Sequence, residues 1–141
     1  MGQCEYSFGH FDQAIQTLTK AIQLSEAAGN LEEVEYAYTW LLASHYDLSD
    51  YDQLFSLRED ALRILEQKFD PRWYVYTLAF VSRNCSELGR WDEAVEIGEK
   101  ALGVAQEYSD NSLIAFAAWN LSITYGWKVD TARAIKYAEL A

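Results

Sequence analysis

The side chains that carry most enzyme and metal chemistry are scarce in this sequence. Its two histidines, His10 and His45, are too few and too far apart to form a facial metal site. His45 also falls on the apolar stripe of a predicted helix, where an inward-facing, hydrogen-bonded histidine is expected. Cys4 and Cys85 form neither a CxxC pair nor a disulfide framework, which fits a reducing compartment. We therefore expect no metal and no cofactor.

Carboxylates gather at one place, where Asp47, Asp50 and Asp52 surround a predicted turn. Their spacing and the missing glycine do not make a calcium-binding EF-hand loop, and helix capping explains them. The sequence also contains neither a phosphate-cradling glycine loop nor a GxSxG nucleophile motif. Because no acid–base pair or nucleophile set converges, we expect that the chain is not an enzyme.

Composition narrows the classes of partner. The 141 residues carry a net charge of −11, which repels a phosphate backbone, so nucleic acid binding is not expected. The acidity is explained either by solubility or by a preference for basic partners. The first residues show no basic region followed by an apolar run, as a signal peptide would, and no apolar run approaches the roughly 18 residues of a membrane span. We expect a cytoplasmic protein that does not bind membranes.

An internal repeat reveals the elements that must position any site. Residues 9–15 (GHFDQAI) return as residues 49–55 (SDYDQLF) and as residues 89–95 (GRWDEAV), with a step of 40 residues each time. The register continues through Ala21, Ala61, Ala101 and Ala141. A fixed period of this length is typical of stacked supersecondary units.

A second set of signals has the same spacing. Asn30, Asp70 and Asp110 are N-cap residue types, and Pro71 stands at a first helical position. Helical spacing of apolar residues between these markers predicts an all-α solenoid, a superhelix of about seven helices in antiparallel hairpins, forming one domain over residues 1–141. The helices are expected at 11–29, 31–47, 51–68, 71–87, 91–108, 111–127 and 131–141, with residues 1–8 as the tail of an earlier helix and junctions near 9–12, 49–52, 89–92 and 129–132.

The junction residues resemble those of the tetratricopeptide repeat. Residues 89–94 (GRWDEA) with Ala101 match its Gly-x-aromatic-Asp-x-Ala junction, and residues 120–125 (NLSITY) resemble its first-helix signature. The period departs from the usual length of about 34 residues. The longer version is similar to repeats of bacterial signalling proteins, including ATPase-linked transcription activators, nucleotide-cyclase fusions and peptide-sensing regulators, and to repeats of animal polarity scaffolds.

Some positions depart from the family pattern. Ser49 replaces a junction glycine and Leu54 a small alanine, and Arg58 stands at an apolar or small position, so the middle hairpin is expected to pack less regularly. Val129 replaces the glycine of the last junction. Thr131 and Ala132 replace the aromatic residue and the aspartate of the same junction.

The resemblance implies that the first helix of each pair lines a concave groove. Helical spacing and the resemblance together assign these residues to its surface: Tyr36, Thr39, Ala43, Tyr46 and Asp47; Tyr76, Ala79, Arg83, Ser86 and Glu87; Phe116, Trp119, Ile123, Gly126 and Trp127. Such an aromatic surface with few charges is typical of a binding site. The alternative is that the aromatic residues fill contacts between neighbouring first helices.

The charged residues of this surface limit which partners it can bind. The family's carboxylate clamp for acidic chaperone tails is missing, since Ala43, Ile123 and Trp127 occupy corresponding positions. Arg83 could bind a ligand carboxylate or form a local salt bridge with Glu87, four residues on.

The expected function is that of a protein–protein interaction module that holds a peptide or partner protein in the groove. The alternative is a ligand- or peptide-sensing regulatory domain of a multidomain bacterial signalling protein. Because neither end shows a polar cap, we also expect a piece of a longer array that can self-associate through its uncapped ends.

Overall fold

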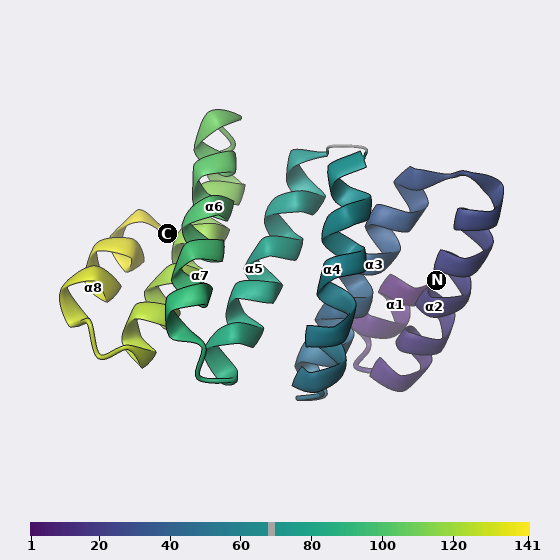
Figure 1. The fold of residues 1–141 in the computed structure, drawn as a ribbon, viewed down its shortest axis with the longest axis horizontal. Coiled ribbons are helices and arrows are strands. Elements are labelled where there is room, and N and C mark those ends of the chain that lie inside the picture. Colours follow the sequence, from purple (N-terminus) through teal and green to yellow (C-terminus); the bar gives the residue numbers. More distant parts are fainter. Residues whose placement is uncertain (68–69) are drawn as a thin grey trace. The chain divides into compact units, whose positions relative to one another are not determined.

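The computed structural model describes residues 1–67 and 70–141, and its regular elements are all α-helices (Figure 1). The chain divides into two compact units, Met1–Phe69 and Asp70–Ala141. Within each unit, successive helices pack as antiparallel pairs, which confirms the predicted fold class. The two units are described separately.

The first unit contains α1 (Gly2–Ser7), α2 (Phe11–Ala28), α3 (Leu31–Asp47) and α4 (Tyr51–Gln67). Its central helix is α3, which packs against the other three, while α1 also contacts α2. Leu18, Val34, Leu42, Leu54 and Leu65 are buried. The apolar stripe of each helix therefore faces its neighbours, as the helical spacing predicts.

The second unit contains α5 (Pro71–Glu87), α6 (Trp91–Glu107), α7 (Asn111–Trp127) and α8 (Thr131–Leu140). Here α7 packs against the other three helices, and α5 and α6 also pack together. The second helices of the pairs, α2, α4, α6 and α8, begin at residues 11, 51, 91 and 131. These starts are 40 residues apart, like the sequence motifs that they contain.

The predicted N-caps are confirmed. Asn30 Oδ1 accepts a hydrogen bond from the Glu33 N–H at 3.4 Å, Asp70 Oδ1 from the Arg72 N–H at 2.8 Å, and Asp110 Oδ1 from the Ser112 N–H at 2.9 Å. Each bond satisfies a backbone donor that the first turn of a helix leaves without a partner.

The junctions within residues 1–67 and 70–141 share one backbone geometry whatever residue they contain. Gly9, Gly29 and Gly89 have φ values of 77°, 68° and 74°, as expected where a glycine ends a helix in the left-handed region. Ser49, Ser109 and Val129 adopt the same region, with φ values of 57°, 53° and 59°. At the Val129 turn the Val129 N–H donates to the Gly126 carbonyl at 3.0 Å, and the Asp130 N–H to the Tyr125 carbonyl at 2.9 Å. These two bonds hold the turn although a β-branched residue disfavours it.

The helix boundaries agree with the predicted ranges to within one residue wherever they can be compared. The predicted end of the fourth helix at residue 68 lies outside the described residues. The expected tail at residues 1–8 is the short helix α1, so the described part of the chain has eight helices rather than about seven.

Candidate partner-binding surfaces

An aromatic cluster lies where α1 and the start of α2 meet α3. This N-terminal aromatic cluster consists of Tyr6, Phe11, Tyr36 and Trp40. The Tyr6 ring centroid lies 5.0 Å from that of Trp40 and 5.5 Å from that of Phe11, and Trp40 lies 6.3 Å from Tyr36. Tyr36 and Trp40 share one face of α3 because they are four residues apart. All four side chains are half-buried.

Hydrogen bonds from α1 to α3 occupy the polar ends of this cluster. The Tyr6 hydroxyl donates to Asp47 Oδ2 at 2.6 Å, and the Tyr36 hydroxyl donates to the Gln3 side-chain oxygen. Burial raises the pKa of the Tyr6 hydroxyl above its ordinary value, and the hydrogen bond to Asp47 raises it further. Asp47, predicted to face a ligand, is therefore already bound by a residue of its own chain.

A second cluster lies where α5 and α7 meet. This C-terminal aromatic cluster consists of Tyr76, Phe80, Phe116 and Trp119. Phe116 is its centre, with ring-centroid distances of 4.8 Å to Tyr76, 6.3 Å to Phe80 and 6.1 Å to Trp119. The edge-to-face geometry of the Tyr76 and Phe116 rings is one that aromatic pairs prefer.

The α7 side of this cluster continues as an accessible stripe. Trp119, Ile123 and Trp127 follow one another at four-residue spacing and so lie on one face of α7. Trp119 is 46% exposed and Trp127 is 53% exposed, while Ile123 is half-buried. The guanidinium carbon of Arg83 lies 4.9 Å from the Trp119 ring centroid, within reach of a cation–π interaction. The predicted pairing of Arg83 with Glu87 stays a prediction.

Four residues assigned to the accessible surface are in fact buried, and their assignment is corrected. Thr39 is 2% exposed, Ala43 0%, Ala79 1% and Ser86 4%. Their side chains are short, so the longer residues around them cover them. The hydroxyl groups of Thr39 and Ser86 are engaged within the protein, with the Glu35 carbonyl at 3.0 Å and with Thr124 Oγ1 at 2.9 Å.

The other predicted residues lie in different surroundings. Tyr36, Tyr76, Arg83, Phe116 and Trp119 belong to or adjoin the two clusters, which the sequence analysis did not separate. Tyr46 packs its ring 5.7 Å from that of Tyr51 at the junction of α3 and α4. Gly126 and Glu87 are exposed. Tyr6, Trp40 and Phe80 were not among the predicted residues, although Trp40 and Phe80 each lie four residues after a predicted tyrosine, Tyr36 and Tyr76.

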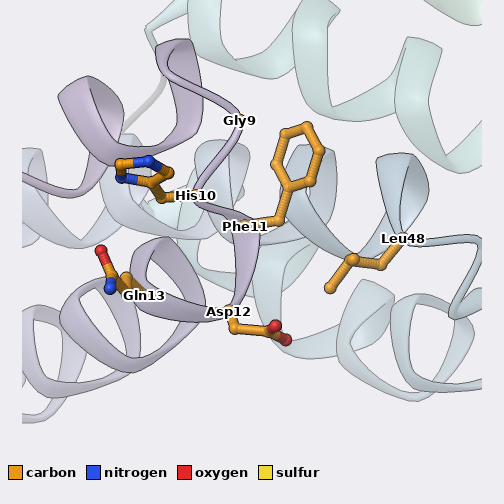
Figure 2. Close-up of a pocket in the computed structure, with 6 residues that line it drawn as sticks. All are labelled: Gly9, His10, Phe11, Asp12, Gln13 and Leu48. Carbon is orange, nitrogen blue, oxygen red and sulfur yellow. The ribbon is translucent and has the colours of Figure 1, made fainter.

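A small pocket opens at the turn between α1 and α2. Gly9, His10, Phe11, Asp12, Gln13 and Leu48 line it, and its volume is about 210 Å³. Figure 2 shows Phe11, Asp12 and Leu48 around one opening, with the Asp12 carboxylate turned to the side on which Leu48 lies. The pocket thus combines an apolar wall with one carboxylate.

A larger cavity, of about 360 Å³, lies among α2, α3 and α4, and His45 is one of the residues that line it. His45 is 7% exposed, and its Nδ1 lies 3.1 Å from Asp50 Oδ2. The prediction of a buried, hydrogen-bonded histidine is confirmed.

The described residues contain neither a metal-binding cluster nor a membrane-spanning helix. Among residues 1–67 and 70–141, no three side chains of the histidine, cysteine or carboxylate type lie close enough together to hold a metal ion. In the same part of the chain, no helix combines the length and the apolar character that crossing a membrane requires. The surfaces described above offer aromatic stacking, apolar contact and single charges.

Comparison with known proteins agrees with this architecture. The sequence profile described as "Tetratricopeptide repeat" matches residues 33–107, more than half of the chain. The chain belongs to the tetratricopeptide repeat family. The matched residues include α3, α4, α5 and α6, and such repeats generally mediate protein–protein interactions and are typically not catalytic.

Two other similarities extend the comparison. A second profile, "Anaphase-promoting complex subunit 5", matches residues 1–48, which contain α1, α2 and α3. The crystal structure of BtubC (BKLC) from P. vanneervenii superposes with a TM-score of 0.69 at 18% identity, over 90% of this chain and 54% of that chain. At this identity the likeness shows the fold alone, and this chain spans about half the length of that protein. A search of curated proteins gave no match.

Proposed function

We propose that this tetratricopeptide repeat chain is a non-catalytic interaction module whose partner protein or peptide docks on the C-terminal aromatic cluster and on the α7 stripe that continues it. The observation that carries the proposal is the exposure of Trp119, which stays 46% accessible while its ring packs on Phe116 and Arg83. Tryptophan and arginine are enriched among the residues that dominate binding energy, and accessible apolar clusters of this kind mark interfaces.

The C-terminal cluster is a better docking surface than the N-terminal one. In the N-terminal aromatic cluster both tyrosine hydroxyls already donate hydrogen bonds, to Asp47 and to the Gln3 side chain, and these bonds join α1 to α3. The α7 stripe instead presents two exposed indole rings, those of Trp119 and Trp127. We infer that the partner contributes apolar or aromatic side chains that pack on these rings.

The test compares two tryptophans of similar exposure in the second unit. Trp119→Ala removes the proposed contact, and Trp91→Ala is the matched control because Trp91 is 43% exposed and belongs to the start of α6, so it is not one of the stripe residues of α7. Peptides selected from a random phage-displayed library against the wild-type protein serve as probes. We expect Trp119→Ala to weaken their binding about tenfold or more, the loss typical of an interface hot spot, and Trp91→Ala to leave it unchanged.

Tyr76→Ala is the second variant, because Tyr76 reaches the same cluster from α5. Its binding loss should accompany unchanged helical content by circular dichroism. Equal binding of the selected peptides by the Trp119→Ala and Trp91→Ala proteins would contradict the proposal. Loss of helix in Trp119→Ala would show instead that this ring is part of the core.

A further inference from the structure

Two residues that line the pocket at the α1–α2 turn have counterparts in the second unit, because Asp12 and Asp92 are two repeats apart, as are Leu48 and Lys128. Asp12 and Asp92 both lie in the first turn of a second helix, and Leu48 and Lys128 both follow the last residue of a first helix. The two sites therefore share a backbone framework. Their side chains differ at four of the six positions, namely His10/Arg90, Phe11/Trp91, Gln13/Glu93 and Leu48/Lys128, and the last of these replaces an uncharged leucine with a lysine.

In the second unit the lysine fills this framework. Lys128 Nζ lies 2.5 Å from Asp92 Oδ1, and the Lys128 side chain is 25% exposed while that of Asp92 is 98% exposed, so the ion pair lies at the surface. The Lys128 ammonium also lowers the pKa of the Asp92 carboxyl below its ordinary value. The chain itself thus shows which chemical group this arrangement accepts, namely a primary ammonium on a flexible aliphatic stem.

In the first unit the same place is open. Leu48 has no charged or hydrogen-bonding group to offer Asp12, and within the described residues no hydrogen bond or ion pair engages the Asp12 side chain. The opening of about 210 Å³ remains between Asp12 and the apolar side chains of Phe11 and Leu48 (Figure 2). Leu48 is 41% exposed, and the nearby Phe8 is 79% exposed.

We propose that this pocket is a second docking point, which receives a lysine side chain of a partner protein. It shares no residue with the α7 stripe. The Asp12 carboxylate accepts hydrogen bonds from the ammonium group, and the aliphatic stem of the lysine packs on Phe11 and Leu48, as such stems do on apolar surface. The net charge of −11 favours approach of a basic partner over an acidic one. The acidity of the chain therefore has a specific use at this point, beyond solubility.

The test uses two small probes that share the same aliphatic stem, of which only one carries an ammonium group. Nα-acetyl-lysine methylamide carries the ammonium group, and Nα-acetyl-norleucine methylamide has a similar stem without it. Each is titrated into ¹⁵N-labelled protein at fixed ionic strength, and amide chemical shifts are followed. We expect saturable shifts at residues 9–13 and 48 with the lysine probe, and Asp12→Asn should reduce the apparent affinity about two- to fivefold, since one exposed charge pair is removed.

Reciprocal exchange of the equivalent side chains gives the sharpest result. Leu48→Lys supplies the ammonium from within the chain and should abolish binding of the lysine probe, while Lys128→Leu should create a new set of shifts at residues 89–93. Trp119→Ala should leave the probe response unchanged, which separates this site from the α7 stripe. Shifts that are equal for both probes, or that survive Leu48→Lys, would overturn the proposal. Circular dichroism of each variant verifies that the fold is retained.

Discussion

Two glycines of α6 test how closely the helices of the second unit approach one another. Gly98 is buried, and a β-carbon placed on it would lie 2.7 Å from Leu121 Cδ2 and 3.1 Å from Ser82 Oγ. A β-carbon on Gly103 would meet no atom within 4 Å. Gly98→Ala and Gly103→Ala therefore make the same chemical change in the same helix, and only the first creates an overlap.

The size of each effect follows from these distances. Alanine is favoured over glycine in a helix interior by about 0.8–1.0 kcal/mol, so Gly103→Ala should raise the free energy of unfolding by about that amount. Gly98→Ala gains the same term but pushes a carbon roughly 1 Å inside normal contact, and overpacking costs about 1–3 kcal/mol. Leu121 is fully buried, and Ser82 Oγ is held by a 2.7 Å bond to the Ala94 carbonyl, so neither side chain can withdraw cheaply.

The assay is urea denaturation followed by circular dichroism, with both variants compared to the wild-type protein. Because both glycines lie in α6, the helix-propensity gain cancels, and Gly98→Ala should be about 1–3 kcal/mol less stable than Gly103→Ala. Equal stability of the two variants would refute the close approach of α6 to α5 and α7 as the reason for glycine at residue 98.

Further predictions concern one turn and the effect of pH. Val129→Gly should raise the free energy of unfolding by about 1 kcal/mol in urea denaturation. A left-handed backbone costs a residue with a β-carbon about 1–2 kcal/mol, and the greater freedom of glycine in the unfolded chain cancels part of the gain. Val129 is 84% exposed, so little packing is lost, and a decrease in the free energy of unfolding would contradict the strain argument. Burial raises the pKa values of Tyr6 and Tyr125 above 10.0 in the folded protein. The stability that these tyrosines contribute is therefore complete below pH 10 and is lost as the pH rises through their folded-state pKa values. In an alkaline titration, the unfolded fraction and the tyrosinate absorbance should increase together. The Arg133 backbone N–H, and then its side chain, lower the pKa of Asp130 below 3.8, so the stability contributed by Asp130 is present above pH 3.8 and lost as the pH falls further. Asp130→Asn should keep the cap but flatten this acid dependence, and an unchanged slope would count against it.

Local rules explain why much of the fold could be predicted from the sequence. The N-caps at Asn30, Asp70 and Asp110 and the helix boundaries depend on interactions within a few residues, which the sequence displays directly. The position of His45 was equally accessible, because the stripe on which it lies is a property of one helix. Val129 was harder, since a β-branched residue gave no reason to expect a left-handed turn.

The candidate site was less predictable because it depends on neighbouring helices. Helical spacing placed Thr39 and Trp119 on the same kind of face, yet one is 2% exposed and the other 46%. The periodicity of one helix does not show how far residues of neighbouring helices cover its face. The contact from Tyr6 to Asp47 joins α1 to α3, and α1 was too short for its role to be recognised.

Several expectations from the sequence remain predictions. Self-association is tested by size-exclusion chromatography, and cytoplasmic location by cell imaging. The regulatory alternative is tested by translating the coding sequence on both sides of this segment for an ATPase, cyclase or DNA-binding domain.

The exchange of Leu48 for Lys128 at one repeat position has an evolutionary consequence. Both residues follow a first helix, where the turn is held by backbone hydrogen bonds, so selection on folding leaves the identity of this side chain largely unconstrained. A duplicated hairpin can therefore carry a lysine that pairs with the aspartate of the next helix, or a residue that leaves this aspartate unpaired, without any change in its backbone. Divergence at such positions would let paralogous arrays acquire or lose partners one turn at a time.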